Sequence, residues 1–224
     1  MRTLISYPLT RESPLYPSIP PVTITPHKSM EGGGSSNSST ITMNSHSGTH
    51  IDLPRHFCKN RESVRDLLMA ENLFFPTYSI PCKKEAGEMI TTEDIEPALD
   101  RVSDAEALLI RTGFSSRRRV NPLIYTSSHP GIDPEIADLL SERCKNLKLI
   151  GIDVISVSLP GKRDLGQRCH KAFLCRNSPI LILEDAFIPE CRNIYFPATL
   201  SIYPFLVDNL DGVPVIAIFE HQTL

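Results

Sequence analysis

The sequence has 224 residues, with 23 basic and 26 acidic side chains, a formal net charge of -3 and no Trp. A chain of this length can bury a sizeable core without disulfides or a structural metal. The balanced charge excludes a general field for nucleic acid or anionic membrane, and no apolar run is long enough to span a bilayer. The first residues lack the apolar run of a signal peptide, so we expect a cytoplasmic protein.

The cysteines and one run of arginines each lead to a separate prediction. The six cysteines are scattered and contain no CxxC pair, so we expect reduced thiols that are mostly buried or incidental. Cys58 could be a metal ligand, but a small buried thiol is the favoured interpretation. The only basic cluster, Arg117-Arg118-Arg119, is interpreted as a solvated surface turn.

The first third of the chain predicts mostly extended or looped backbone. Many prolines interrupt residues 1–30, and proline blocks helix interiors and central strands. Residues 31–40 (EGGGSSNSST) predict a flexible loop that is too short for a domain linker. Residues 41–53 look extended, and residues 61–74 look helical at least in their first part.

After this region, predicted strands alternate with predicted helices. A helix is expected over 133–147, because Asp133 is a good N-cap, Pro134 suits the first helical position, and apolar residues recur at helical spacing. A short helix is expected over 168–175. Buried strands are expected over 106–112, 148–158, 179–184 and 213–219. This alternation predicts one α/β domain spanning residues 1–224.

The polar residues with the clearest chemical pattern lie within an eleven-residue window, at the even positions His46, His50, Asp52 and His56. Side chains alternate faces along an extended chain, so these four are expected on one side, while Ile51 and Leu53 face the core. Gly48 and Pro54 oppose the alternative of a helix. Two imidazoles and a carboxylate suit a divalent ion of the zinc or manganese type and leave a position open for water. His56, two pleats beyond Asp52, could then transfer protons.

A second candidate pair is His170 with Glu184. Glu184 ends the apolar run 179–183, and a carboxylate buried there would need a partner because burying it alone is costly. From the residues alone, Glu184 could equally emerge into solvent or meet an arginine.

The run His46-Ser-Gly-Thr-His50-Ile-Asp52-Leu-Pro54-Arg-His56-Phe57 resembles the signature H-x-G-T-H-x-D-x-P-x-H-F of the cyclase family of metal-dependent hydrolases, which includes bacterial kynurenine formamidases and isatin hydrolases. Every fixed position of the signature is present. Further similarity covers most of the chain: the start (ISYPL, LYPSIP), LLIRTGF at 108–114, the stretch 130–158, the segment 170–184 and LDGVPVIAI at 210–218.

The resemblance implies an α/β fold of the swivelling β/β/α type, with a mixed or barrel-like sheet, peripheral helices and usually a homodimer. It implies that His46, His50 and Asp52 bind Zn²⁺ or Mn²⁺. His170 and Glu184 match positions that complete a second site or lie beside the first metal, and His56 matches the proton-transfer residue. Two departures stand out: the spacing from His170 to Glu184 is two residues longer than in many members, and the N-terminal Trp of many kynurenine formamidases is missing.

Three functions follow as hypotheses. The first is a metal-dependent amidohydrolase in which His56, alone or together with Glu184, delivers a proton to the departing nitrogen, with N-formylkynurenine as the leading substrate on resemblance alone. The second keeps the chemistry but opens a lactam such as isatin or another cyclic amide, which the lack of Trp mildly favours. The third is a metal-binding protein without hydrolase activity, against which the intact His56 argues.

Overall fold

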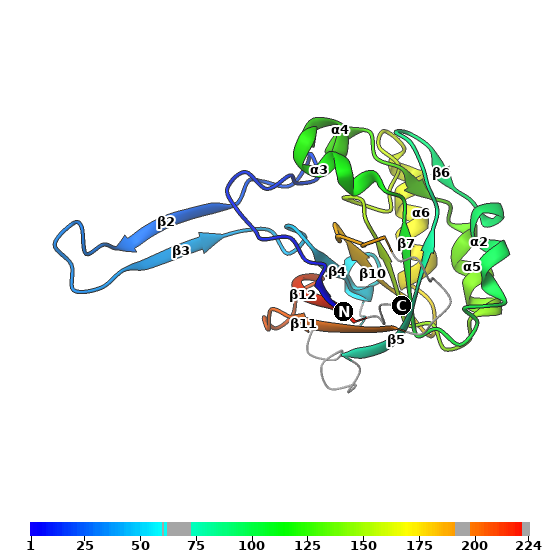
Figure 1. Cartoon of the computed structure of the whole chain (residues 1–224). Helices are drawn as coiled ribbons and strands as arrows, with labels where there is room; N and C mark the ends of the chain where they lie inside the picture. Colours follow the sequence, from blue (N-terminus) through cyan, green and yellow to red (C-terminus); the bar gives the residue numbers. More distant parts are fainter. Residues whose placement is uncertain (60, 62–72, 191–197, 221–224) are drawn as a thin grey trace.

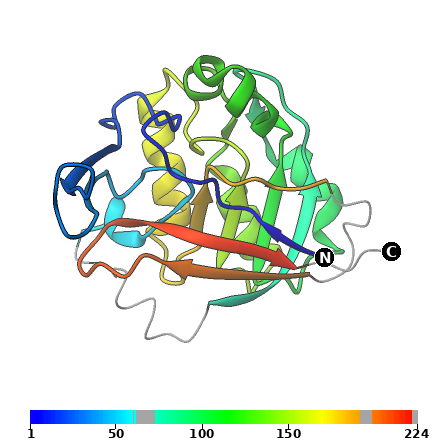
Figure 2. The ribbon, with the colours of Figure 1, turned by 60° about the vertical axis from the view of Figure 1, so that its left-hand side comes forward.

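The computed structural model describes residues 1–59, 61, 73–190 and 198–220. Its central sheet is built from β1 (Arg2–Leu4), β4 (His50–Asp52), β5 (Phe74–Pro81), β7 (Ala107–Arg111), β9 (Leu149–Ile152), β10 (Leu181–Glu184), β11 (Ala198–Pro204) and β12 (Gly212–Glu220). The strand order is β1-β12-β11-β5-β7-β9-β10-β4, and β4 also pairs with the start of β12. This last pairing closes the sheet into a barrel-like ring, with β1 alongside the later part of β12 (Figure 2).

Three of the parallel strands at the centre of this sheet, β7, β9 and β10, are built from nearly continuous apolar runs. The pairs β5–β7, β7–β9 and β9–β10 are parallel, and the remaining pairings of the central sheet are antiparallel. Along β7, Leu108 and Ile110 join the core under the helices, whereas Ala107 and Leu109 join the core inside the ring. A sheet buried on both faces in this way needs apolar residues at every position.

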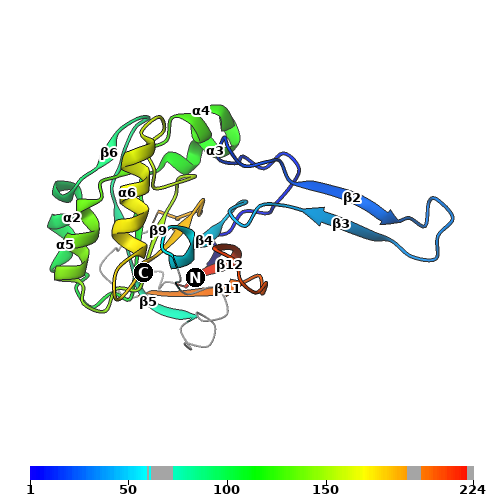
Figure 3. The same cartoon turned by 180° about the vertical axis from the view of Figure 1, so that it is seen from behind.

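The longer helices in the described ranges lie on one side of the sheet. These are α2 (Thr92–Leu99), α5 (Glu135–Arg143) and α6 (Arg163–Leu174), which lie together there (Figures 1 and 3). The short helices α3 (Arg117–Val120) and α4 (Pro122–Ser127) lie at one end of the ring, and two 3-10 turns, η1 (Pro54–His56) and η2 (Phe114–Ser116), follow β4 and β7. None of the helices in the described ranges is long and apolar enough to cross a membrane.

Two small sheets complete the described structure. The strands β6 (Met89–Ile90) and β8 (Gly131–Ile132) pair in parallel beside the helices. The strands β2 (Thr23–Lys28) and β3 (Ser38–Thr42) form an antiparallel hairpin that projects far from the body as an arm (Figure 1). Every residue of β3 is exposed.

The structure confirms the expected α/β fold with a barrel-like mixed sheet and peripheral helices. The buried strands expected over 106–112, 179–184 and 213–219 correspond to β7, β10 and β12. The helix expected over 168–175 begins earlier, at Arg163, and the helix expected over 133–147 ends earlier, at Arg143. The strand expected over 148–158 ends at Ile152, because Asp153 turns to accept hydrogen bonds from residues 112–115.

Two expectations in the first half of the chain were wrong in part, and a third lies almost wholly outside the described residues. Residues 31–40 do not form only a loop, because 38–40 belong to β3. Residues 41–53 are not one extended segment, since turns separate β3 from β4. The helix expected over 61–74 falls almost wholly outside the described residues, and Phe74 begins β5.

The prediction that all cysteines are reduced was also wrong. Cys58 and Cys175 form a disulfide across a sequence separation of 117 residues, so Cys58 is neither a free thiol nor a metal ligand. Cys82, Cys144 and Cys169 are free and buried, as expected. Sequence spacing could not reveal the pair, because two scattered cysteines become neighbours only when the segment after β4 meets the end of α6.

Candidate metal centre

The short strand β4 is placed where residues from three parts of the chain meet. In its pairing with β10, His50 lies opposite Glu184, and in its pairing with β12, Asp52 lies opposite Gly212. The helix α6 adds His170 to the same place, with its Nε2 atom 3.2 Å from Asp52 Oδ2. The structure therefore brings together the five predicted metal-binding residues His46, His50, Asp52, His170 and Glu184.

His46 reaches this cluster by a different route from the one expected. The chain turns between Asn44 and Ser47, and Gly48 adopts a positive φ of 69° that favours glycine. This turn folds the His46 ring back so that its Nδ1 lies 2.8 Å from Asp52 Oδ1. The four even positions do converge, but a turn and the η1 helix bring them together, not a shared face of one strand.

Asp52 is the hub of the cluster and is only 1% exposed. Its Oδ1 atom contacts His46 and lies 3.3 Å from His50 Nε2, while its Oδ2 atom faces His170. Glu184 lies on the other side of the same two rings, with its carboxylate oxygens 3.5 Å from His50 Nε2 and from His170 Nε2. One carboxylate is thus shared by three imidazoles, and a second carboxylate by two.

Hydrogen bonds to backbone carbonyls orient two of these rings. His50 Nδ1 lies 2.8 Å from Gly48 O, and His170 Nδ1 lies 2.8 Å from Gly166 O, so each Nδ1–H donates to a carbonyl. This leaves each Nε2 directed at the carboxylates. An imidazole held by a carbonyl at one nitrogen and turned inward at the other is the usual arrangement of a metal ligand.

Glu184 is held in a similar way. Its Oε1 atom accepts hydrogen bonds from Val157 N at 2.7 Å and from Ser156 Oγ at 3.1 Å. The residues after β9 therefore fix one carboxylate oxygen and leave Oε2 facing His50. Glu184 is buried and does not emerge into solvent, and it meets no arginine among the described residues; these were the two alternatives that its sequence context left open.

The cluster carries a strong negative potential. Burial by itself lowers the pKa of His46, but hydrogen bonds to Asp211 and Asp52 outweigh it and raise that pKa to about 10. Burial likewise lowers the pKa of His170, and the two carboxylates Asp52 and Glu184 outweigh it and raise that pKa to about 10. Carboxylates that hold protons so firmly on neighbouring imidazoles would also attract a metal cation.

Two buried atoms test whether the residues fit a metal. Within the described ranges, His50 Nε2 and Asp52 Oδ2 make no hydrogen bond although both are buried. Buried polar atoms are rarely left in this state, and a cation between nitrogen and carboxylate oxygens would satisfy both. One ligand atom each from His50, Asp52 and Glu184 lies within 4.8 Å of the others, and the same holds for His46, Asp52 and His56. The donor set therefore fits one or two divalent ions.

His56 stands at the edge of this cluster. It ends η1, its ring centroid lies 4.1 Å from that of His46, and its side chain is 26% exposed, against 1% for Asp52. Its Nδ1 atom lies 3.0 Å from Asp211 Oδ2. His56 is thus the histidine of the group that solvent or a substrate can reach.

Sequence reasoning missed Asp211 and Gly212, which stand at the start of β12. Asp211 Oδ2 also lies 3.1 Å from His46 Nε2, and a Cβ atom on Gly212 would lie 2.4 Å from His46 Cε1. An Asp-Gly pair directly before a buried strand was a signal in the sequence, but nothing in it indicated that the pair meets residues 165 positions earlier.

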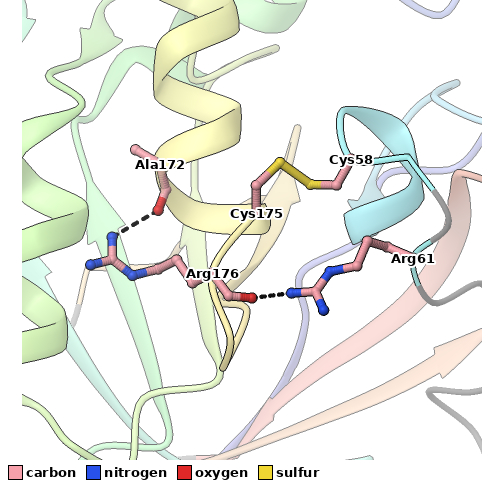
Figure 4. Close-up of a disulfide and its surroundings, with 5 residues drawn as sticks. All are labelled: Cys58, Arg61, Ala172, Cys175 and Arg176. Carbon is pink, nitrogen blue, oxygen red and sulfur yellow. Dashed lines mark hydrogen bonds between the residues drawn. A yellow bond between two sulfur atoms is a disulfide. The ribbon is translucent and has the colours of Figure 1, made fainter.

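The disulfide joins two segments that carry site residues. Cys58 follows His56 by two positions, and Cys175 follows the last residue of α6, the helix that carries His170 (Figure 4). Nearby, the Arg61 guanidinium donates to Arg176 O, and Arg176 Nη1 donates to Ala172 O at 2.9 Å. These bonds tie the segment after β4 to the end of α6.

Residues 4–158 match the family model described as "Putative cyclase". The chain belongs to the cyclase family. It is 31% identical over 216 residues to kynurenine formamidase of Bacillus thuringiensis subsp. konkukian, and this match covers 96% of the chain and 95% of the relative. The resemblance read from the signature is therefore confirmed over nearly the whole length.

Solved structures agree with the fold of this family member. Isatin hydrolase A from Labrenzia aggregata, bound to benzyl benzoate, superposes with a TM-score of 0.80 at 20% identity, covering 98% of this chain and 93% of that one. Isatin hydrolase A from Ralstonia solanacearum gives 0.78 at 17% identity, covering 98% and 91%. At these identities the likeness concerns the fold.

Proposed function

We propose that the protein is a metal-dependent hydrolase that cleaves the C–N bond of a small amide. The observation that carries this proposal is the buried cluster around Asp52, where imidazole nitrogens and carboxylate oxygens converge and two atoms have no hydrogen-bond partner in the described structure. His46, His50 and Asp52 would hold one ion, and Asp52, His170 and Glu184 a second. Histidine with carboxylate suits Zn²⁺ or Mn²⁺.

The ion would act as a Lewis acid toward a carbonyl oxygen and make nearby water more acidic. The protein's own residues would orient the site and move protons. His56 has its Nδ1 directed at Asp211, so its Nε2 is the nitrogen available to accept a proton from water and return it to the departing nitrogen. Glu184 is buried and held by Val157 and Ser156, which supports a ligand role more than proton delivery.

N-formylkynurenine is the leading substrate. The support is that a relative 31% identical over almost the full length carries the name kynurenine formamidase. A lactam of the isatin type is the second candidate, favoured by the fold likeness to isatin hydrolases and by the absence of Trp. A metal-binding protein without activity is the third, and the accessible His56 beside the cluster argues against it.

The test combines metal analysis with hydrolysis of both substrates by the wild type and by His50→Ala. We expect the wild type to bind about one or two ions per chain and to hydrolyse at least one substrate, and His50→Ala to lose both properties. His27→Ala is the matched control, because His27 is an exposed histidine on the arm. Full turnover after metal removal, or stoichiometric metal with no hydrolysis of either substrate, would contradict the proposal.

We also expect a homodimer or higher homo-oligomer, which the family resemblance implies. The arm supports this expectation, because an isolated two-stranded hairpin is marginally stable in water and gains from a covering surface. Sedimentation velocity of the purified chain measures the assembly state. A monomer at micromolar concentration would contradict the expectation.

A further inference from the structure

Asp211 occupies a position between the buried cluster and the residue at its edge. Its backbone carbonyl accepts a hydrogen bond from Leu53 N at 3.0 Å, which fixes the residue beside the end of β4. One side-chain oxygen, Oδ2, lies 3.1 Å from His46 Nε2 and 3.0 Å from His56 Nδ1. The other oxygen, Oδ1, accepts a hydrogen bond from Ser45 Oγ at 3.0 Å. Both oxygens are therefore engaged, and one of them faces two imidazoles.

The chemistry of these atoms decides which ring nitrogens carry protons. An ionised carboxylate oxygen only accepts, so each ring nitrogen facing Oδ2 must be an N–H donor. An aspartate carboxylate is ordinarily ionised at neutral pH, and the two oxygens of Asp211 face three possible donors, Ser45 Oγ, His46 Nε2 and His56 Nδ1. His46 therefore carries its proton on Nε2, and His56 carries its proton on Nδ1.

The two tautomers are complementary. By the same rule His46 Nδ1, which lies 2.8 Å from Asp52 Oδ1, is also an N–H donor as long as no metal is bound. Because Asp211 holds the proton on Nε2, Nδ1 is the nitrogen that would lose its proton and bind the metal. With its proton on Nδ1, His56 keeps the lone pair of Nε2 for accepting a proton. A carboxylate behind a metal-binding histidine is a frequent device for fixing ring orientation, and here the same oxygen also holds the proton-transfer histidine.

Gly212 leaves the space that the His46 ring occupies. A Cβ at this position would lie 2.4 Å from His46 Cε1 and 2.8 Å from its Nδ1, so the ring packs directly against the backbone next to Asp211. Any larger residue would push the ring out of the hydrogen bond. The pair Asp211-Gly212 therefore supplies both the acceptor for His46 and the space that its ring occupies.

We infer that Asp211 is a positioning residue that fixes His46 and His56 in opposite tautomers, so that one ring is ready to bind a metal and the other to accept a proton. This inference rests on the proposed hydrolase function for the role of His56. The part of the inference that concerns His46 requires only that the cluster binds a metal.

The test compares Asp211→Ala and Asp211→Asn with Asp208→Ala, an exposed carboxylate three positions earlier in the same connection. Three quantities are measured: the Zn²⁺ dissociation constant, kcat and KM separately, and the tautomers of zinc-loaded protein from long-range ¹H–¹⁵N correlations of the histidine rings. Asn keeps an acceptor oxygen of the same reach, so it serves as the conservative variant and covers the case in which the Ala variant folds poorly.

For Asp211→Ala we expect Zn²⁺ affinity to fall by about 10- to 100-fold, kcat to fall by about 100-fold and KM to change little. The ring correlations of His46 and His56 should change from single tautomers to mixtures. Asp211→Asn should recover most of the lost kcat, and Asp208→Ala should match the wild type.

Two outcomes would overturn the inference. One is a folded Asp211→Ala protein with the wild-type tautomers and with kcat and Zn²⁺ affinity equal to those of Asp208→Ala. The other is Asp211→Asn without any recovery relative to Asp211→Ala. Zn²⁺ affinity and ring tautomers do not require an amide substrate. A wild type that hydrolyses nothing would therefore reject the proposed function, while these two measurements would still decide the role of Asp211.

Discussion

Glu184 and Asp185 are consecutive buried carboxylates at the end of β10, yet their surroundings differ in kind. Asp185 accepts two hydrogen bonds from the Arg118 guanidinium at 2.8 Å and one from Tyr125 OH at 2.6 Å. Arg118 in turn lies 3.9 Å from the ring centre of Tyr7. The chain supplies a permanent cation for Asp185, so this cluster is complete without any ligand.

In the part of the chain that the structure describes, Glu184 pairs with histidines and with no arginine. One of its oxygens is held by the residues after β9, and the other faces histidine nitrogens that also face Asp52. The comparison shows how structural and functional buried charge differ in this protein. A carboxylate with a bidentate arginine stabilises the fold, whereas carboxylates that face only imidazoles would, under the proposed function, be completed by a metal ion.

Among these variants, Asp52→Asn should have the largest effect on the metal-binding cluster around Asp52. The change removes the charge shared by His46, His50 and His170 while keeping the size of the side chain. We expect metal affinity to fall by more than the roughly 100-fold typical of an outer hydrogen bond, and hydrolysis to become undetectable. Calorimetric titration with Zn²⁺ measures the loss. If the variant binds Zn²⁺ as tightly as the wild type, Asp52 is not a metal ligand.

Asp185→Asn should lower the stability of the fold while leaving metal binding intact. Arg118 would be left buried without its carboxylate, which is expected to lower the free energy of unfolding by about 3–5 kcal/mol. Asn tolerates the positive φ of 52° at this position, so the backbone adds little strain. Urea unfolding of the metal-free protein measures the change.

The control for Asp185→Asn is its neighbour, Glu184→Gln. This variant keeps an oxygen for Val157 N and leaves no arginine unpaired, so its unfolding free energy should change less while its metal affinity falls. The folded Asp185→Asn protein should still bind metal. Equal loss of stability in the two variants would contradict the distinction between the clusters.

Opening the disulfide should have the smallest effect of the three. Cys58→Ser removes a link that closes a long loop, and about 2–4 kcal/mol of stability is expected to be lost. Reducing agent should lower the melting temperature of the wild type and leave that of Cys58→Ser unchanged. If reducing agent leaves the melting temperature of the wild type unchanged, the Cys58–Cys175 disulfide is contradicted.

Thiol trapping during cell lysis would test the compartment as well. Disulfides persist mainly in oxidising compartments, whereas the sequence led us to expect a cytoplasmic protein. Recovery of Cys58 and Cys175 in the trapped, reduced form would support the cytoplasm. Recovery of the intact disulfide would count against it.

The comparison also shows where prediction from sequence succeeded and failed. The basic run 117–119 was interpreted as a solvated turn, but it belongs to the helix α3. Arg117 and Arg119 are exposed as expected, whereas the side chain of Arg118 is only 11% exposed. Nothing in three successive arginines indicates which one will meet a buried carboxylate 67 positions later. The choice depends on the position of α3 against β10.

The sequence by itself determined the chemistry of the site. His46, His50, Asp52 and His56 lie within eleven residues in a specific signature, and the wider family resemblance added His170 and Glu184. The buried strands were also determined locally, because continuous apolar runs have few other stable arrangements.

Only the tertiary structure decided the rest. It placed Asp211 between His46 and His56, joined Cys58 to Cys175, and paired Arg118 with Asp185. It also showed that His46, His50, Asp52 and His56 converge because the chain turns before β4 and enters η1 after it. A single extended strand was expected instead. The physical cause is the same in each case: such contacts join residues far apart in the chain, and they form only when the sheet closes and sets its strands in register.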